Sequence, residues 1–254
     1  MEQTVETMTY ATVLYALCLA TTCYSAEIPS SLQKCNRKDG NFDKCLVSAI
    51  DDALSKSANP VKEIGLGTLE PLDVPSLVIG EGSGAVAFQQ NYRDIKISGF
   101  SKVKCSKADM NFDTKVLTLD CETPLVRMDF HYEINGKLLV LPIKGDGPGF
   151  IEMDKLRLEI SFALEEHDKK GKKHYKVAST KLVLTPQLMR FHLENLFDGD
   201  KALGDNINQV LNENWSEVFS DVKTSYEEAF GQIFGSILDN VLKKVSTREL
   251  FGDA

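Results

Sequence analysis

The sequence predicts an α+β fold in which a long C-terminal α-helix is wrapped by a highly curved antiparallel β-sheet. The run from Leu203 to Val245 carries apolar side chains every three or four residues and contains no proline, which is helical spacing. Before it, roughly between residues 85 and 184, apolar and polar side chains alternate as they do in strands. Long neighbouring strands joined by turns imply an antiparallel, strongly curved sheet. A chain of 254 residues with 43% hydrophobic content can bury one large core, and we expect one elongated domain.

The N-terminus differs in kind from the rest of the chain. An apolar block at residues 11–20 is followed by small residues, which is typical of a secretory signal peptide. Glu2 and Glu6 precede the block and no lysine or arginine does, a departure from the usual basic start. We expect residues 1–25 to be a signal peptide, residues 26–254 to form the mature domain, and the protein to be secreted into extracellular fluid. No apolar segment is long enough for stable membrane insertion.

Four cysteines belong to the mature chain, and an even number favours disulfides in a secreted protein. Cys35 and Cys45 bracket a turn-rich loop, and we expect them to be bonded. Cys105 and Cys121 lie equally far from Asp113, so they face one another if the chain folds back there. Either a disulfide or two buried thiols would satisfy that arrangement. No CxxC pair exists, so we expect neither a metal nor a cofactor.

The charge of the chain argues against a nucleic-acid partner. The formal net charge is −8, and loss of Glu2 and Glu6 with the signal peptide changes it to −6. The one basic cluster, Lys169–Lys173, lies between two strand patterns. This position is typical of a solvated hairpin tip rather than of a phosphate or membrane site.

The expected elements begin with a short helix. Apolar residues from Phe42 to Leu54 recur at helical spacing, and Asn59-Pro60 ends the pattern. Strands are expected at residues 85–90, 94–105, 116–121, 126–134, 156–164 and 175–184. Asn135-Gly136 predicts a tight hairpin turn into a strand at 137–141. The glycine-rich segment Gly145–Gly149 predicts a bulge or loop before the following strand.

The apolar stripe of the long helix widens along its length. From Ala229 to Leu242 the apolar residues come in adjacent pairs, which is wider than the seam of a coiled coil. This width favours a sheet as the covering element. A coiled-coil or bundle helix is the alternative.

A curved sheet closed on such a helix can leave a void that an apolar ligand fills. Each square ångström removed from water contributes about 25 cal/mol. The candidate wall residues of this tunnel are the large side chains Phe130, Phe162, Leu164, Trp215, Phe219, Tyr226, Phe230 and Phe234. Simple core packing is the alternative role for each of them. Trp215 and Tyr226 also offer an N–H or O–H to a ligand carbonyl.

Several short segments of the sequence resemble those of a known family. They are Asn195–Lys201, Asn208–Trp215, Cys35 with Cys45, Glu70–Asp73, Gly99-Phe100 and Leu141–Gly147. The mature chain as a whole resembles the Takeout and juvenile hormone binding protein family of insects. The resemblance implies a tunnel for an apolar ligand inside a tubular lipid-binding architecture. Lys223-Thr224 replaces a proline common in the family, and we expect the long helix to be straight there.

We therefore expect a secreted, monomeric carrier of a small hydrophobic ligand such as a juvenile-hormone-like terpenoid or a fatty acid. The resemblance links such proteins to feeding, circadian or chemosensory signalling, with a protein receptor as a further partner. No G-x-S-x-G or HExxH motif exists and the four histidines are scattered, so no catalytic residue is assigned and an enzyme is not expected. The alternative function is a protein-interaction module with a vestigial cavity and no bound ligand.

Overall fold

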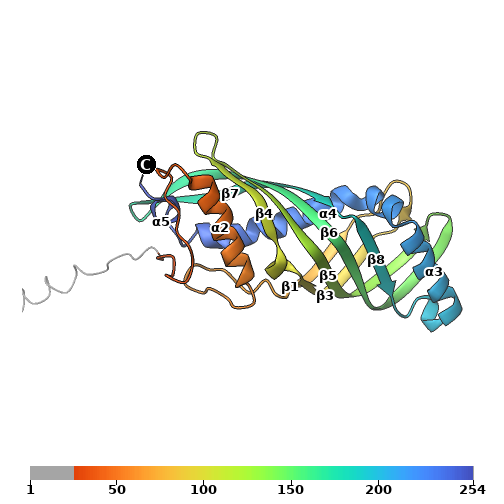
Figure 1. Cartoon of the computed structure of the whole chain (residues 1–254). Helices are drawn as coiled ribbons and strands as arrows, with labels where there is room; N and C mark the ends of the chain where they lie inside the picture. Colours follow the sequence, from red (N-terminus) through yellow and green to blue (C-terminus); the bar gives the residue numbers. More distant parts are fainter. Residues whose placement is uncertain (1–25, 254) are drawn as a thin grey trace, which may run out of the picture.

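The computed structural model describes residues 26–253, and it is elongated (Figure 1). A long helix, α4 (Trp215–Leu242), runs along the long axis, and the strands of a curved sheet cross it obliquely. Helix α2 (Phe42–Ser55) lies near one end, with the short helix α5 (Thr247–Phe251), and α3 (Lys201–Glu213) lies near the other end. The expected signal peptide, residues 1–25, lies outside the described part of the chain.

Among residues 26–253, eight strands form one sheet in which every pairing is antiparallel. They are β1 (Leu72–Ile79), β2 (Val86–Ala87), β3 (Gln90–Ser98), β4 (Lys104–Asn111), β5 (Val116–Leu138), β6 (Leu141–Lys169), β7 (Lys172–Thr185) and β8 (Leu188–Leu193). The main path through the sheet is β1-β3-β5-β6-β7. Strands β2 and β4 pair with β5, and β8 pairs with β6. Two short 3₁₀ helices, η1 (Phe100–Lys102) and η2 (Phe197–Gly199), complete the fold.

The lengths of the elements show why the sheet is curved. Strand β6 has 29 residues, which would extend over roughly 95 Å if straight. Helix α4 has 28 residues and is therefore roughly 42 Å long. A strand twice as long as the helix that it covers has to cross it obliquely and bend. Register shifts between Arg93 and Lys96, and between Ala163 and Leu164, mark irregularities of the kind that bend strands.

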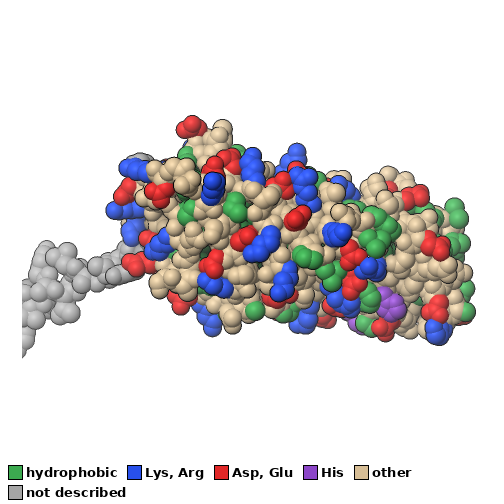
Figure 2. Space-filling model, in the orientation of Figure 1, with side chains coloured by type: hydrophobic (Ala, Val, Ile, Leu, Met, Phe, Trp, Pro, Cys, Tyr) green, Lys and Arg blue, Asp and Glu red, His purple; other side chains and the backbone are tan. Residues whose placement is uncertain are grey.

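The alternation of apolar and polar side chains along each strand decides which face of the sheet meets the helix. In β6 the side chains of Leu156, Leu158, Ile160, Phe162 and Leu164 are buried. The charged side chains between them point to the outer face, where positive and negative groups are interspersed (Figure 2). The predicted fold class, a long C-terminal helix wrapped by a curved antiparallel sheet, is confirmed.

Polar side chains of α4 accept hydrogen bonds from the edge strand β7. Asp239 Oδ1 accepts from the Val177 N–H at 3.0 Å, and Glu227 Oε1 accepts from the Leu184 N–H at 2.8 Å. The helix therefore supplies acceptors that a further strand would supply. Asp221, on the same helix, accepts from the backbone N–H groups of Ser83, Gly84 and Val86 at 2.8–3.0 Å and so fixes the loop before β2.

The expectation of one helix from Leu203 to Val245 is wrong in two respects, because α4 ends at Leu242 and the run is divided. The chain leaves helical geometry at Asn214, with φ −112° and ψ 21°, which separates α3 from α4. The Asn214 side-chain amide donates to the Val210 carbonyl oxygen at 2.8 Å, and asparagine is a weak helix former for this reason. At Lys223-Thr224 α4 continues without a break, as expected.

Three other local expectations are wrong. Strand β5 continues through Asn135-Gly136, and the hairpin turn comes later, at Leu139-Val140, between paired Leu138 and Leu141. Segment Gly145–Gly149 is neither a bulge nor a loop, because it pairs in regular register with β5. The strand expected at 94–105 is divided by η1 into the end of β3 and the start of β4.

Two further strand expectations also differ from the structure. The strand expected at 85–90 is reduced to β2, and the strands expected at 116–121 and 126–134 are parts of the single strand β5. The expected first helix, the hairpin about Asp113 and the basic turn are confirmed. Helix α2 occupies the expected segment, and β4 and β5 form the hairpin about Asp113. The basic cluster lies at the β6–β7 turn, where Lys170 and Gly171 have positive φ.

Candidate functional site

An apolar cavity lies between α2, α4 and the concave face of the sheet. Its volume is about 270 Å³. Every side chain on its wall is apolar. The lining residues are Ile50, Ala53, Leu54, Leu66, Leu69, Leu72, Phe100, Val103, Leu117, Leu119, Cys121, Leu158, Ile160, Phe162, Leu182, Phe234, Ile237, Leu238 and Val241. We call this space the main cavity.

Helix α4 presents its wide apolar stripe to the main cavity. Phe234, Ile237, Leu238 and Val241 all line it and are only half-buried by protein atoms. The adjacent apolar pairs of the sequence therefore supply much of this wall, and both members of the Ile237–Leu238 pair line it. Gly235 lies among them, and a Cβ there would come within 2.5 Å of Thr180 Oγ1 in β7, so the glycine lets helix and strand approach closely.

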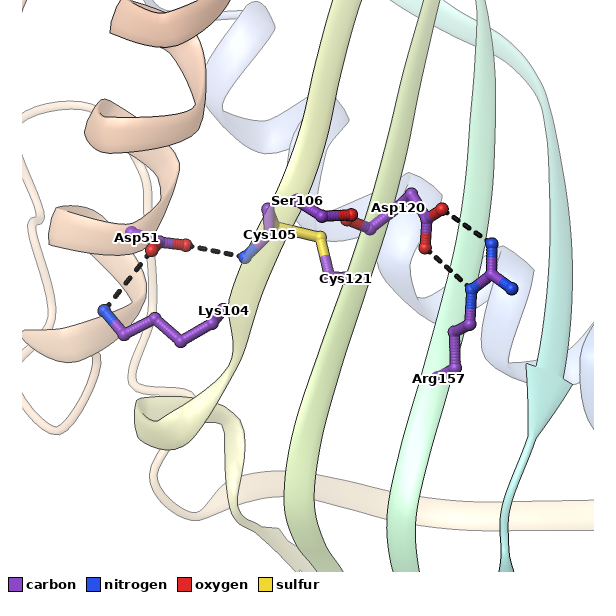
Figure 3. The surroundings of a disulfide bond; sticks show 7 residues. All are labelled: Asp51, Lys104, Cys105, Ser106, Asp120, Cys121 and Arg157. Carbon is purple, nitrogen blue, oxygen red and sulfur yellow. Dashed lines mark hydrogen bonds and ion pairs between the residues drawn. A yellow bond between two sulfur atoms is a disulfide. The ribbon is translucent and has the colours of Figure 1, made fainter.

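Helix α2 forms another wall and is tied to the β4–β5 hairpin. Asp51 Oδ1 accepts from the Cys105 N–H at 2.9 Å, and its other oxygen lies 3.3 Å from Lys104 Nζ (Figure 3). The structure contains a disulfide between Cys105 and Cys121 on that hairpin. A second disulfide, between Cys35 and Cys45, ties the start of α2 to the preceding segment. Cys121 also lines the main cavity, so this bond fixes part of its wall.

Two smaller cavities lie within the apolar core. The first, of about 20 Å³, is lined in part by Phe100, Leu158 and Phe234, which also line the main cavity. The two spaces therefore adjoin. The second, of about 30 Å³, is lined mostly by apolar residues but also by Gln90, Tyr92 and Tyr132. We call it the polar-end cavity.

A buried group of three polar side chains lies beside the polar-end cavity. Gln90 Oε1 accepts from the Tyr92 hydroxyl at 2.8 Å and from the Tyr226 hydroxyl at 3.0 Å, and the two hydroxyl oxygens are 2.9 Å apart. Burial raises the pKa of Tyr92, against a smaller lowering by its hydrogen bond to Tyr226. Burial, and then the neighbouring Tyr92, raise the pKa of Tyr226. Both hydroxyls therefore stay protonated and neutral.

The structure distributes the predicted wall residues unevenly. Phe162 and Phe234 line the main cavity, and Phe230 lines the first small cavity with Phe234. Tyr226 belongs to the polar group.

The other predicted wall residues line none of these three spaces. Phe130 packs against Tyr92 with ring centroids 4.5 Å apart, and Phe219 packs 6.4 Å from Tyr226. Leu164 is buried in β6, and Trp215 is the half-buried first residue of α4. Their role as tunnel walls stays a prediction.

Sequence reasoning missed the wall that α2 provides and the polar group around Gln90. The apolar stripe of α2 carried a usable signal, because Ile50, Ala53 and Leu54 repeat at helical spacing. Gln90 carried none, since a polar residue at the start of a strand is ordinarily exposed.

Residues 26–253 hold no group of three histidine, cysteine or acidic residues arranged to bind a metal. The helices in this part of the chain include none that is both long enough and apolar enough to cross a membrane.

Known proteins resemble this chain along most of its length. The family model for haemolymph juvenile hormone binding protein (JHBP) matches residues 13–252. The circadian clock-controlled protein daywake of Drosophila yakuba and that of Drosophila melanogaster are each 26% identical over 200 residues, 76% of this chain and 76% of each relative. The crystal structure of Epiphyas postvittana Takeout 1 matches with a TM-score of 0.76 at 24% identity, covering 87% of this chain and 100% of the solved chain, which shows a shared fold. The family model spans the sheet and all of the described helices, and the chain therefore belongs to the haemolymph juvenile hormone binding protein family.

Proposed function

We propose that this protein is a carrier that holds a small hydrophobic ligand in the main cavity. The observation that carries the proposal is the wall itself, on which every side chain is apolar. Water in such a space finds no hydrogen-bond partner, and an apolar cavity of about 150 Å³ in another protein stays dry and binds benzene. A cavity of about 270 Å³ accommodates a larger apolar molecule. Membership of a family described as hormone binding proteins supports the same class of function.

The proposal extends to how the ligand enters. Helix α2 covers one side of the main cavity. Asp51 holds it to the β4–β5 hairpin through the Cys105 N–H and through a partly exposed ion pair with Lys104, and such an ion pair contributes little. We propose that α2 moves away from the β4–β5 hairpin to admit the ligand, while the Cys35–Cys45 disulfide keeps its first turn in place. Juvenile-hormone-like terpenoids and fatty acids are the ligand candidates.

Location and physiology are further parts of the proposal. We propose that residues 1–25 are removed and that residues 26–254 act as one monomeric domain in extracellular fluid. The haemolymph family supports this location, and Edman sequencing of protein secreted by insect cells would locate the new N-terminus. The two daywake relatives are named for control by the circadian clock, which supports a role that varies with time of day.

A cavity-filling variant tests the carrier function. Ala53→Trp places a large ring in the main cavity from α2, and we expect the affinity for the apolar fluorophore N-phenyl-1-naphthylamine to fall at least about tenfold, the loss of roughly 1.4 kcal/mol of binding. Ala202→Trp, on the exposed face of α3, is the control and should bind as the wild type does.

Native mass spectrometry and lipid extraction of the purified wild type complete the test. A retained apolar small molecule supports the carrier. A ligand-free protein that binds no fluorophore but holds a tight protein partner would favour the interaction-module alternative.

A further inference from the structure

Gln90 is a buried polar residue whose environment the fold does not explain. Its side chain is only 7% exposed, yet no atom within residues 26–253 accepts a hydrogen bond from Nε2. The other end of the same amide is well satisfied, because Oε1 faces both tyrosine hydroxyls. An unpaired buried amide costs about 1–3 kcal/mol, so evolution rarely leaves one in an apolar core without a compensating use.

The free amide lies beside space that a ligand atom can occupy. Gln90 lines the polar-end cavity, whose volume of about 30 Å³ admits one small polar group or one water molecule. The hydroxyls of Tyr92 and Tyr226 fix the amide in place. Gln90 therefore presents a preorganised N–H donor.

The polar group and the main cavity lie along the same face of α4. Tyr226, Phe230 and Phe234 are spaced four residues apart, and successive rings stack with centroids 6.2 Å apart. Phe234 borders the main cavity, so Tyr226 is displaced from it by about 12 Å along the helix. The adjoining small cavity lies in that interval, beside Phe230. A ligand that spans both spaces has to displace the Phe230 ring, which stacks between Tyr226 and Phe234.

We propose that Gln90 binds the carbonyl oxygen of an uncharged ligand, such as a ketone or an ester, whose apolar chain extends past Phe230 and Phe234 into the main cavity. This inference rests on the proposed carrier function and names the ligand's polar end. A neutral acceptor fits because neither Tyr92, Tyr226 nor the apolar wall offers a positive charge, and a carboxylate buried there would be unpaired. The amide N–H then gains the partner that it lacks.

A matched pair of probes tests the proposal. Displacement of N-phenyl-1-naphthylamine by 2-tridecanone and by n-tridecane compares two chains of equal length that differ in one carbonyl oxygen. We expect the wild type to bind the ketone about threefold to tenfold more tightly, the effect of one net hydrogen bond. In Gln90→Met the preference should disappear. In Met189→Leu, a volume-conserving change at a buried residue of β8 that lines none of the three cavities, it should persist.

A measurement on the wild type alone covers the case in which Gln90→Met does not fold. With 2-tridecanone labelled at the carbonyl carbon, the infrared band of the bound ketone should shift to lower wavenumber than in hexane. Equal affinity for both probes together with an unshifted band would overturn the role of Gln90 and leave the carrier intact. Failure of both probes to displace the fluorophore would overturn the carrier and the inference with it.

Discussion

Asn208 and Asn212 show how single side chains complete a sheet. Each amide bonds twice to the backbone of β8, Asn208 to the N–H and carbonyl of Leu193 and Asn212 to those of Phe191, all at 2.8 Å. The residues are four apart, so both lie on one face of α3. Asparagine within a helix is unfavourable, and its repetition here is a signal that the sequence did contain. Its meaning needed the strand, which lies fifteen residues or more away in the chain.

Loss of one of these amide side chains should lower the stability of the folded protein. Asn208→Ala leaves the Leu193 N–H and carbonyl without that partner, and we expect the free energy of unfolding to fall by about 1–3 kcal/mol. Urea denaturation measures this change. Alanine is the better helix former, so helix propensity acts in the opposite direction. The exposed Asn206→Ala on the same helix is the control, and an equal stability of both variants would contradict the role assigned to Asn208.

At the scale of elements, the alternating patterns predicted most strands, whereas the turns and glycines were misread. Asn135-Gly136 is a strong local hairpin signal, but a Cβ on Gly136 would lie 2.4 Å from the Ala87 carbonyl oxygen, so this glycine serves the approach of β2. The actual turn contains Leu139, at φ 54°, and Val140, neither of which is a typical turn residue. Register over the long β5–β6 pair therefore outweighed local turn preference.

The glycines of β6 have an equivalent explanation. A Cβ on Gly145 would approach the Tyr132 hydroxyl to 2.6 Å, and one on Gly147 would approach the Glu194 carbonyl oxygen to 2.5 Å. The segment after β8 therefore crosses directly over these positions. Sequence patterns within β6 contain no information about a segment that arrives fifty residues later, and so the region was expected to be a bulge.

Alanine at one of these positions should displace the crossing segment. We expect Gly147→Ala to lower the free energy of unfolding by about 1–3 kcal/mol, because the backbone of Glu194 has to move to admit the methyl group. Thermal unfolding followed by circular dichroism measures the loss. Gly67→Ala is the matched control, since a Cβ there meets nothing within 4 Å. Wild-type stability of Gly147→Ala would show that the crossing segment is not held against β6.

At the scale of the whole molecule, the overall architecture was predictable from the sequence, whereas the position of the main cavity was not. Helical spacing over Leu203–Val245 and alternation over the strands were sufficient for a helix wrapped by a sheet. The cavity depends instead on how much space side chains from α2, the sheet and α4 leave between them. The amount of that space depends on residues distant in sequence. Phe219 and Phe130 therefore pack against other rings, while Ala53 borders the main cavity.

The carboxylates of α4 make the stability of the molecule depend on acid pH. Burial alone would raise the pKa of Asp221, but three backbone N–H donors outweigh it and lower the pKa. At Asp239 burial also acts to raise the pKa, but the hydrogen bonds from Lys243 and from the Val177 N–H outweigh it and lower the pKa. A depressed pKa stabilises the folded state fully above the unfolded value of about 3.9, and this contribution is lost as pH falls through the folded value.

We therefore expect the free energy of unfolding of Asp221→Asn to depend less steeply on pH in the acid range than that of the wild type. Chemical denaturation between pH 7 and pH 2 should show a lower free energy of unfolding for the variant at pH 7 and a smaller difference from the wild type near pH 2. Asp113→Asn, in the exposed β4–β5 turn, removes the same charge and should leave this pH dependence unchanged. A difference between wild type and Asp221→Asn that stays constant with pH would contradict this linkage.

The side chains that α4 and α3 direct at β7 and β8 also bear on how these molecules tolerate crowding. An exposed edge strand can pair with a strand of another molecule, and repeated pairing of this kind builds fibrils. Asp239, Glu227, Asn208 and Asn212 occupy the edges of β7 and β8 with groups that no neighbouring chain can extend. The same hydrogen bonds that shape the interior thus occupy backbone groups of β7 and β8 that a strand of a second copy would otherwise pair with.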